Sequence, residues 1–185
     1  MRLHDEILNQ TGEIIASARR ILCVCHANPD GDAIGSLLGM GLLLEAAYPK
    51  AQVSLHCRDR VPDTFTFLSA SVRITTLPAC QPGDCLVFLD TAEPKLTGVQ
   101  ERDELFDGSF PSINIDHHPT NTRFGSIDII EAEASSTCEI IVALADHFGW
   151  ELTSDTATAL LTGMYTDTGG LLHSNTTAAV CRVAA

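Results

Sequence analysis

One short loop constrains the fold of this chain more than any other part of its sequence. It follows an apolar run at residues 21–24 and precedes a long apolar helical pattern at residues 34–47. One imidazole and two carboxylates, those of His26, Asp30 and Asp32, stand between these two patterns. The proline and the glycine among them favour a tight turn that can aim all three side chains at one point. A chain does not need this combination in order to fold, whereas a metal ion needs such side chains as ligands.

Apolar runs and helical patterns alternate along the chain. We expect strands near residues 21–26, 53–57, 72–76, 85–90, 113–116 and 124–130. We expect helices near residues 5–18 (interrupted at the Thr11-Gly12 pair), 34–47, 63–69, within 95–110, near 135–149 and 154–166, and from 175 onward. This alternation is typical of βαβ units. The sequence therefore predicts an α/β fold, a mostly parallel, Rossmann-like sheet with helices on both faces.

The chain has the length of one domain. Its 185 residues favour a single domain over residues 1–185, and 45% of them are hydrophobic, which is enough for a packed core. The helical pattern at residues 34–47 contains Gly35, Gly39 and Gly41 among leucines. Glycine lowers helix stability, so we expect these small residues to serve a close approach of the helix backbone to the sheet.

The composition is acidic. Eleven basic and 24 acidic residues give a formal net charge of −13. This balance argues against a stand-alone nucleic-acid binder, which usually carries a basic face. It does not exclude a nucleotide substrate, because bound divalent ions would neutralise part of the acid at the point where a phosphate must approach.

The cysteines and the chain start point to a cytoplasmic protein. There are seven cysteines, an odd number, and they form no CxxC pair, which argues against a structural zinc site. Residues 1–6 lack the apolar core of a secretory signal, and no apolar run is long enough to span a bilayer. We therefore expect a thiol-rich cytoplasmic protein with no membrane partner.

Side chains of the kind that bind metals stand at the ends of three expected strands and one expected helix. They are His26 with Asp30 and Asp32, then Asp90, then Asp116 with His117 and His118, and finally Asp167 before two glycines. In an open α/β sheet, ligands bind beyond the carboxyl ends of the strands, so one cleft can collect these residues. Mixed histidine and aspartate ligands suit Mn²⁺, Fe²⁺ or Zn²⁺. So many ligands suit two ions about 3.5–4 Å apart that share a carboxylate.

Each of these residues also has an ordinary explanation when it is taken alone. Asp30, Asp90 and Asp167 are of a type that caps helices or forms turns, and the histidine pair could lie on the surface. Together, these explanations require four independent coincidences at element ends of one sheet, so we favour the metal site. The remaining histidines lack such neighbours, although His173 lies close to Asp167 in the sequence.

In order and rough spacing, the motifs resemble the four motifs of the DHH phosphoesterase superfamily. The matching residues are His26-x-x-x-Asp30-x-Asp32, Asp90 after an apolar strand, Asp116-His117-His118, and Asp167-Thr168-Gly169-Gly170. The resemblance covers residues 21–177, nearly the whole chain. The sequence of residues 28–36, together with Ala134-Ser135-Ser136-Thr137, is most similar to the nano-RNase and pAp-phosphatase branch. Enzymes of that branch degrade very short oligonucleotides and 3′-phosphoadenosine 5′-phosphate (pAp).

The resemblance implies a site with two divalent metal ions, usually Mn²⁺, and a role for each motif residue. His26 and Asp30 would hold one ion, and Asp32, His117 and Asp167 the other. Asp90 would bridge the two ions. His118 would face the scissile phosphate, and Asp116 would orient the histidines, as metal-bound imidazoles commonly require. Asp90, Asp116 and His118 are therefore the expected catalytic residues.

The function predicted from this resemblance is metal-dependent hydrolysis of a short oligonucleotide, of pAp, or of both. A water activated by two ions would attack the phosphorus in line. A cyclic-dinucleotide phosphodiesterase and an inorganic pyrophosphatase would use the same metals. The pyrophosphatase is disfavoured because no basic cluster occurs beyond Arg19-Arg20. A third alternative, from another class, is a catalytically impaired metal-binding fragment. The oligomeric state stays open, with a homodimer among the alternatives.

Relatives of this branch carry a C-terminal DHHA1 domain with a glycine-rich substrate-binding motif. No such motif occurs in this sequence. We therefore expect the chain to be a fragment that holds the catalytic half of a two-domain protein and lacks the half that selects the substrate. The missing half would be a natural place for basic contacts to phosphate.

Overall fold

The computed structural model describes residues 4–185, so the first three residues of the N-terminal segment considered above lie outside the described residues. The strands are β1 (Arg20–Cys25), β2 (Gln52–His56), β3 (Asp84–Leu89), β4 (Ser112–Asp116) and β5 (Ile127–Ile130). The α-helices are α1 (Asp5–Ser17), α2 (Gly31–Ala47), α3 (Thr137–Phe148), α4 (Ser154–Asp167) and α5 (Ala178–Ala184). Four 3-10 helices are η1 (Asp63–Phe65), η2 (Ser71–Arg73), η3 (Pro94–Thr97) and η4 (Asp103–Leu105).

The five strands form one sheet in the order β2-β1-β3-β4-β5, and every neighbouring pair is parallel. The predicted α/β class with a parallel sheet is confirmed. From β1 the chain moves one way across the sheet to β2, and from β3 it moves the other way to β4. Because crossovers between parallel strands are right-handed, these two connections must lie on opposite faces.

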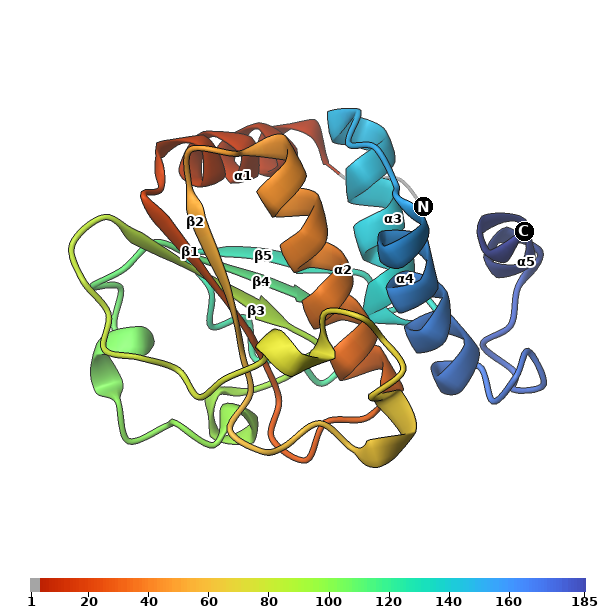
Figure 1. Cartoon of the computed structure of the whole chain (residues 1–185). Coiled ribbons are helices and arrows are strands. Elements are labelled where there is room, and N and C mark those ends of the chain that lie inside the picture. Colours follow the sequence, from red (N-terminus) through yellow and green to blue (C-terminus); the bar gives the residue numbers. More distant parts are fainter. Residues whose placement is uncertain (1–3) are drawn as a thin grey trace.

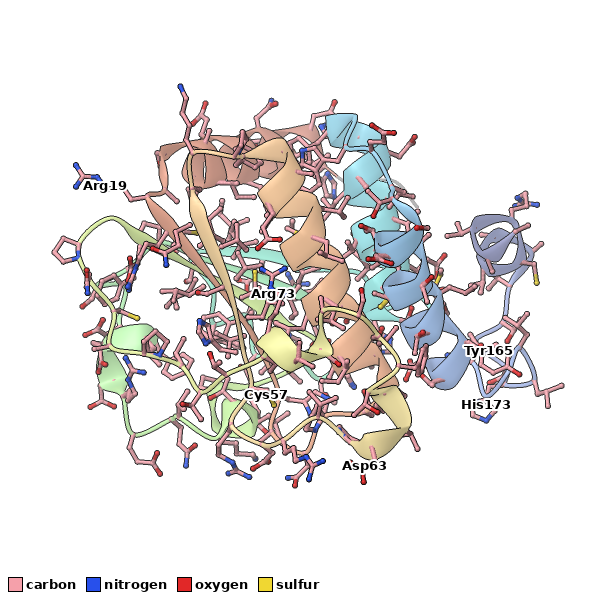
Figure 2. All side chains as sticks on the ribbon, in the orientation of Figure 1. Arg19, Cys57, Asp63, Arg73, Tyr165 and His173 are labelled. Carbon is pink, nitrogen blue, oxygen red and sulfur yellow. The ribbon has the colours of Figure 1, made fainter. Side chains whose placement is uncertain are left out.

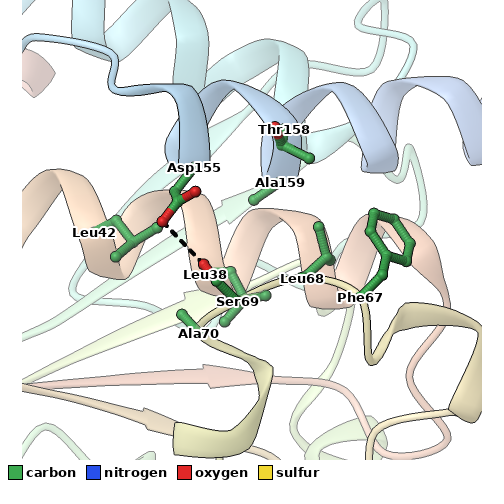
Figure 3. Close-up of a pocket in the computed structure, with 9 residues that line it drawn as sticks. All are labelled: Leu38, Leu42, Phe67, Leu68, Ser69, Ala70, Asp155, Thr158 and Ala159. Atoms are coloured by element: carbon green, nitrogen blue, oxygen red, sulfur yellow. Dashed lines mark hydrogen bonds between the residues drawn. The ribbon is translucent and has the colours of Figure 1, made fainter.

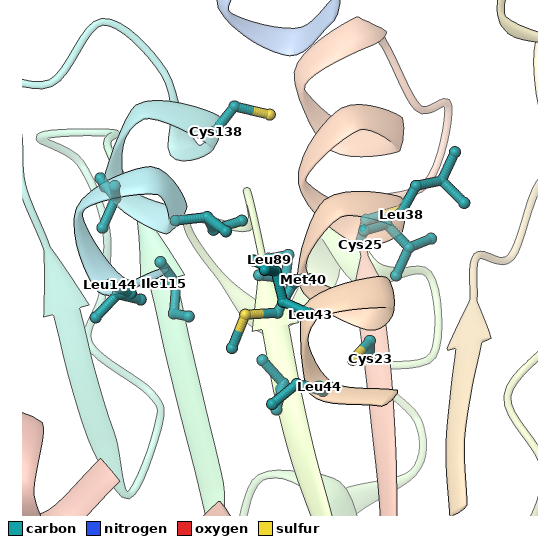
Figure 4. Packing of buried hydrophobic residues seen from close by; sticks show 14 of the residues in the cluster. Cys23, Cys25, Leu38, Met40, Leu43, Leu44, Leu89, Ile115, Cys138 and Leu144 are labelled. Atoms are coloured by element: carbon teal, nitrogen blue, oxygen red, sulfur yellow. The ribbon is translucent and has the colours of Figure 1, made fainter. Parts of the chain in front are cut away.

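The long helices occupy one face of the sheet. Side chains of β1 and β3 on this face pack with α1, α2, α3 and α4 in the larger hydrophobic core. Figure 1 shows α2, α3 and α4 side by side, and Figure 4 shows Met40, Leu43 and Leu44 of α2 close to Leu89 and Ile115 of the strands. Most of the apolar surface that the chain buries therefore lies between these helices and the sheet.

The other face carries only short 3-10 helices and loops. Leu22, Val24 and Phe88 point to this face and form a second core with Leu105 of η4. The Phe88 ring lies 5.0 Å from the Phe124 ring, centroid to centroid, in an edge-on arrangement. The expectation of helices on both faces therefore holds with a refinement: the polar segment between β3 and β4 forms 3-10 turns rather than an α-helix.

Three further local expectations differ from the structure. Helix α1 runs without interruption through Thr11 and Gly12, because the Thr11 side chain is fully buried and Gly12 lies against the Phe148 ring. The helix expected at residues 63–69 is only the one-turn η1. The strand expected at residues 72–76 is wrong. Residues 71–73 form η2, and only Thr75 bridges to β2, through two backbone hydrogen bonds of 3.0 Å.

The glycines of α2 serve two different contacts. A Cβ atom at Gly35 would lie 2.6 Å from the carbonyl oxygen of Ala159, and one at Gly39 would strike the side chain of Leu160. Both contacts are with α4. Only Gly41 faces the sheet, at Leu55 of β2. The expected close approach is therefore mainly one between two helices.

Among residues 4–185, no helix is both long enough and apolar enough to cross a bilayer.

Candidate metal centre

The register of the sheet places the predicted residues in a row. Cys25 pairs with Leu89, and Leu89 pairs with Ile115, so His26, Asp90 and Asp116 come next on three adjacent strands. The chain reverses its direction across the sheet between β1 and β3, which is where ligands bind in open α/β sheets. The structure brings all eight predicted side chains into three overlapping clusters. These clusters are His26-Asp30-Asp90, Asp32-His117-Asp167 and Asp90-Asp116-His117-His118.

In the first cluster, His26 turns one ring nitrogen toward two carboxylates. Its Nε2 lies 3.4 Å from Oδ2 of Asp90 and 3.8 Å from Oδ1 of Asp30. Its Nδ1 lies 2.8 Å from the carbonyl oxygen of Ala27, which can only accept, so Nδ1 carries a hydrogen. Burial lowers the pKa of His26, but Asp30 and Asp90 outweigh burial and raise the pKa to about 11. Because Nδ1 is engaged with Ala27, Nε2 is the nitrogen left to bind a metal in place of its proton.

Asp30 has a structural role as well. It is the N-cap of α2, and its Oδ1 accepts hydrogen bonds of 3.0 Å from the backbone N–H groups of Asp32 and Ala33. Burial raises the pKa of Asp30, but the nearby His26 ring and these N–H groups outweigh burial and lower the pKa to about 2. The helix-cap explanation and the metal-ligand explanation for this residue therefore do not compete.

The second cluster is organised around His117. Its Nε2 lies 3.4 Å from Oδ2 of Asp167 and 3.9 Å from Oδ2 of Asp32. Asp32 is only 1% exposed, and burial together with the nearby Asp90 charge raises its pKa well above the ordinary value. Burial is also the main reason for the raised pKa of Asp167. Both carboxylates are therefore held in a place where an added cation would stabilise their charged form.

Asp90 stands between the two histidines. Its Oδ2 faces Nε2 of His26, and its Oδ1 lies 3.7 Å from Nε2 of His117. The side chain is 2% exposed. Its backbone has a φ of 55°, in the left-handed region, which costs a residue other than glycine roughly 1–3 kcal/mol and persists only where the surroundings hold it. The fold therefore directs this carboxylate to a position shared by both clusters.

Asp116 holds the two consecutive histidines. Its Oδ1 accepts from the backbone N–H of His117 over 2.8 Å and from Nδ1 of His118 over 2.7 Å. Its Oδ2 accepts from the Asn121 side chain over 2.6 Å. The hydrogen bond that His118 donates to Asp116 raises the pKa of His118 to about 9, although burial opposes the rise. With Nδ1 committed to Asp116, His118 has its Nε2 left for another partner, on a ring that is 44% exposed.

Sequence reasoning missed several residues that hold this centre together. The sequence indicates Thr137 only as part of a helix start, yet its backbone and hydroxyl donate to Asp32 and Asp90. No sequence signal points to Asn121. None points to Asn175 as a partner of the centre either, although its side chain donates to the carbonyl oxygens of Ser135 and Asp167, over 3.1 and 3.2 Å. The Ser-Ser-Thr segment supports the family resemblance, but nothing local to it indicates its partners.

His173 and the cysteines stay outside the clusters of the described residues. His173 contacts the Asp167 backbone rather than its carboxylate: Nδ1 of His173 lies 3.4 Å from the backbone oxygen of Asp167, and the His173 side chain is exposed. Figure 2 shows it beside Tyr165 near the end of α4. All seven cysteines are free.

The cavities beside α4 lie apart from the metal clusters. One of about 70 Å³ is enclosed by α2, α4 and residues 67–70, and a hydrogen bond of 3.0 Å joins Ser69 to Asp155 at its edge (Figure 3). A larger groove of about 410 Å³ is lined by Phe67 and Tyr165. Tyr165 and Asp167 are two residues apart, and therefore point about 200° apart around the helix. The groove faces away from the centre.

Known proteins resemble this chain in sequence and in fold. The family described as "DHH family, N-terminal domain" matches residues 20–164. A protein of Thermus thermophilus named "Bifunctional oligoribonuclease and PAP phosphatase NrnA" is 38% identical over 190 residues, which cover 100% of this chain and 52% of that protein. A protein of the same name from Mycoplasma pneumoniae is 29% identical over 161 residues, covering 85% of this chain and 48% of that protein.

A solved structure shares the fold. It is an exopolyphosphatase-related protein from Bacteroides fragilis, with a TM-score of 0.88 and 26% identity, and the match covers 97% of this chain and 55% of that one. The chain thus spans about half the length of the relatives it matches. It corresponds to the N-terminal half of the Thermus and Mycoplasma relatives.

Proposed function

The chain belongs to the DHH family, whose N-terminal domain it matches, and we propose on this basis that it is the catalytic domain of a two-metal phosphoesterase. Its proposed substrates are short oligonucleotides and pAp, the classes named in its NrnA relatives. The observation that carries the proposal is the position of Asp90, which turns one carboxylate oxygen toward His26 and the other toward His117. A carboxylate between two such clusters is suited to bridge a pair of ions.

The residues present fit a pair of divalent ions. Asp32 and Asp90 are buried carboxylates within one centre, and like charges in a buried site repel each other. No lysine or arginine of residues 4–185 forms an ion pair with any carboxylate of the clusters. Histidine nitrogen and carboxylate oxygen are donors that Mn²⁺ accepts. We propose that His26 and Asp30 hold one ion, that Asp32, His117 and Asp167 hold the other, and that Asp90 bridges them.

The remaining motif residues would orient the substrate and stabilise its charge. When bound, the two ions would supply an activated water and neutralise phosphoryl charge. In the metal-free chain the hydrogen bond to Asp116 raises the pKa of His118 to about 9, which favours a cationic ring. Such a ring would offer the N–H of its exposed edge to a phosphoryl oxygen. Asp116 would keep both histidines in place, because its two oxygens accept hydrogen bonds from His117, His118 and Asn121.

The test is hydrolysis by the 185-residue chain with added Mn²⁺. We expect turnover of pAp or of a diribonucleotide. Asp90→Asn should lower the rate at least roughly 100-fold, because it removes the shared charge while keeping the shape of the side chain. Asp84→Asn is the matched control, a carboxylate equally buried at the opposite end of β3. It should lower stability and retain most of the activity.

Other outcomes would identify the alternatives. Turnover of a cyclic dinucleotide alone, or of pyrophosphate alone, would replace the proposed substrate. Binding of two Mn²⁺ per chain without turnover of any of these substrates would indicate a metal-binding domain that is inactive in isolation. Wild-type rates in Asp90→Asn would contradict the bridging role.

A further inference from the structure

Thr137, the first residue of α3, contacts carboxylates from two other parts of the chain. Its backbone N–H donates to Oδ2 of Asp32 over 2.7 Å, and its hydroxyl donates to Oδ1 of Asp90 over 3.1 Å. Thr137 is completely buried, and the two carboxylates are 1% and 2% exposed. One residue thus holds a carboxylate of the second cluster and the carboxylate that both clusters share.

The two contacts depend on different parts of Thr137. Asp32 is held by the backbone, since the N–H of Cys138 also donates to its Oδ1, over 3.1 Å. Figure 4 shows Cys138 at the start of α3 with its side chain directed toward α2. First-turn N–H groups have no partner within their own helix, so Asp32 acts as a cap for them. A change of side chain at position 137 leaves this contact intact.

Asp90 is held by the side chain. Among the described residues, the Thr137 hydroxyl makes the only hydrogen bond shorter than 3.4 Å to the Asp90 carboxylate. The backbone N–H of Asp90 is engaged with the Ile115 carbonyl at 3.0 Å, which fixes the main chain but leaves the carboxylate free to rotate. A β-branched side chain has few χ1 rotamers, and the buried Thr137 adopts the one in which its hydroxyl points to Asp90.

We propose that Thr137 is a positioning residue of the metal centre, whose hydroxyl sets the plane of the Asp90 carboxylate. In this orientation Oδ2 faces His26 and Oδ1 faces His117. The proposal rests on the proposed function, because it assigns the residue a role toward the two ions. The Thr137 side chain is fully buried, and its hydroxyl acts through the hydrogen bond to Asp90.

The test compares Thr137→Val and Thr137→Ser with the wild-type chain. Valine keeps the shape and the backbone N–H but loses the hydroxyl, and serine keeps the hydroxyl. We measure Mn²⁺ binding by titration calorimetry and magnetic coupling of the ion pair by electron paramagnetic resonance. The valine variant should bind the second Mn²⁺ at least roughly tenfold more weakly and lose the coupled-pair spectrum. The serine variant should stay close to wild type in both.

Ser136→Ala is the matched control. Ser136 is the N-cap of α3 and accepts from the Glu139 N–H over 3.2 Å, but it does not contact the metal-site carboxylates. Its loss should lower the melting temperature without changing Mn²⁺ binding. If Thr137→Val does not fold, Thr137→Ala removes the same hydroxyl without adding bulk and should show the same loss.

The outcomes separate the two proposals. Wild-type affinity and a wild-type coupled spectrum in a folded Thr137→Val or Thr137→Ala variant would overturn the role of Thr137 while leaving the two-metal function standing. A wild-type chain that binds no Mn²⁺ would overturn the proposed function and this inference together.

Discussion

At the scale of single residues, the centre depends on which atom of each side chain is left free. His26 commits Nδ1 to the Ala27 carbonyl and His118 commits Nδ1 to Asp116, so each histidine is left with Nε2. Asp116 in turn accepts hydrogen bonds from His117, His118 and Asn121. Residues of identical type therefore have different roles, and hydrogen bonds outside the centre decide which role each one takes.

His118 offers a prediction at this scale. The Asp116 hydrogen bond raises its pKa to about 9, so Asp116→Asn should return the pKa toward the ordinary value of about 6.5. Nuclear magnetic resonance of the imidazole nitrogens in metal-free protein measures both values. A pKa raised by folding stabilises the folded state fully below the unfolded pKa, and this stability is lost as the pH rises through about 9. The same pKa in both proteins would contradict the assignment.

At the scale of elements, the centre is formed where helix ends meet strand ends. Asp30 caps the start of α2, α3 begins at the residues that hold Asp32, and α4 ends at Asp167. These ends coincide only because α2 and α4 pack closely along their length. A Cβ at Gly163 of α4 would lie 2.7 Å from Oδ1 of Asp32. The glycines between α2 and α4 therefore let the carboxylates come together, in addition to allowing the two helices to pack closely.

The packing of α2 on α4 gives a prediction for Gly35→Ala. The new Cβ would lie 2.6 Å from the backbone oxygen of Ala159, and such overpacking should lower the free energy of unfolding by about 1–3 kcal/mol. Gly12→Ala in α1 is the control, since its Cβ would meet only the edge of the Phe148 ring, at 3.3 Å, and alanine favours the helix. Urea unfolding of both variants tests the pair. Equal stability would show that α2 and α4 separate at little cost.

At the scale of the whole molecule, charge differs between the two ends of the sheet. At the beginning of β1, Arg20 forms a two-pronged ion pair with Asp84 of β3, with N–O distances of 2.8 and 2.6 Å. At the carboxyl ends of the strands, five aspartates gather without a lysine or arginine partner among the described residues. The fold therefore holds these like charges close together, although they repel one another, in a chain whose net charge is already −13.

Metal addition should therefore stabilise the whole chain. An ion that binds only the folded state stabilises it by about 2.7 kcal/mol at a concentration 100 times its Kd. We expect Mn²⁺ to raise the melting temperature of the wild-type chain, and excess chelator to reverse the rise. Asp90→Asn should show little of this increase and should be more stable than the wild type without metal, because one buried negative charge is gone. An equal rise in both proteins would place the stabilising ion elsewhere.

The homodimer stays a prediction, which sedimentation velocity can test.

The sequence by itself determined the parts of this protein that depend on local pattern. Alternating strands and helices require a parallel sheet, and the carboxyl ends of parallel strands share one edge. This pattern alone is enough to predict that His26, Asp90 and Asp116 meet. Within the loop at residues 26–32, the local turn places Asp30 as the cap of the helix that follows it.

Tertiary structure alone decided which residues hold these side chains in place. Thr137 reaches Asp32 across 105 positions of sequence, and Asn175 reaches Ser135 across 40. The failed strand at residues 72–76 has the same origin, since pairing depends on what lies beside the sheet edge rather than on the apolar pattern. Local propensity carries no information about which distant elements become neighbours, and that choice follows from the burial of the common core.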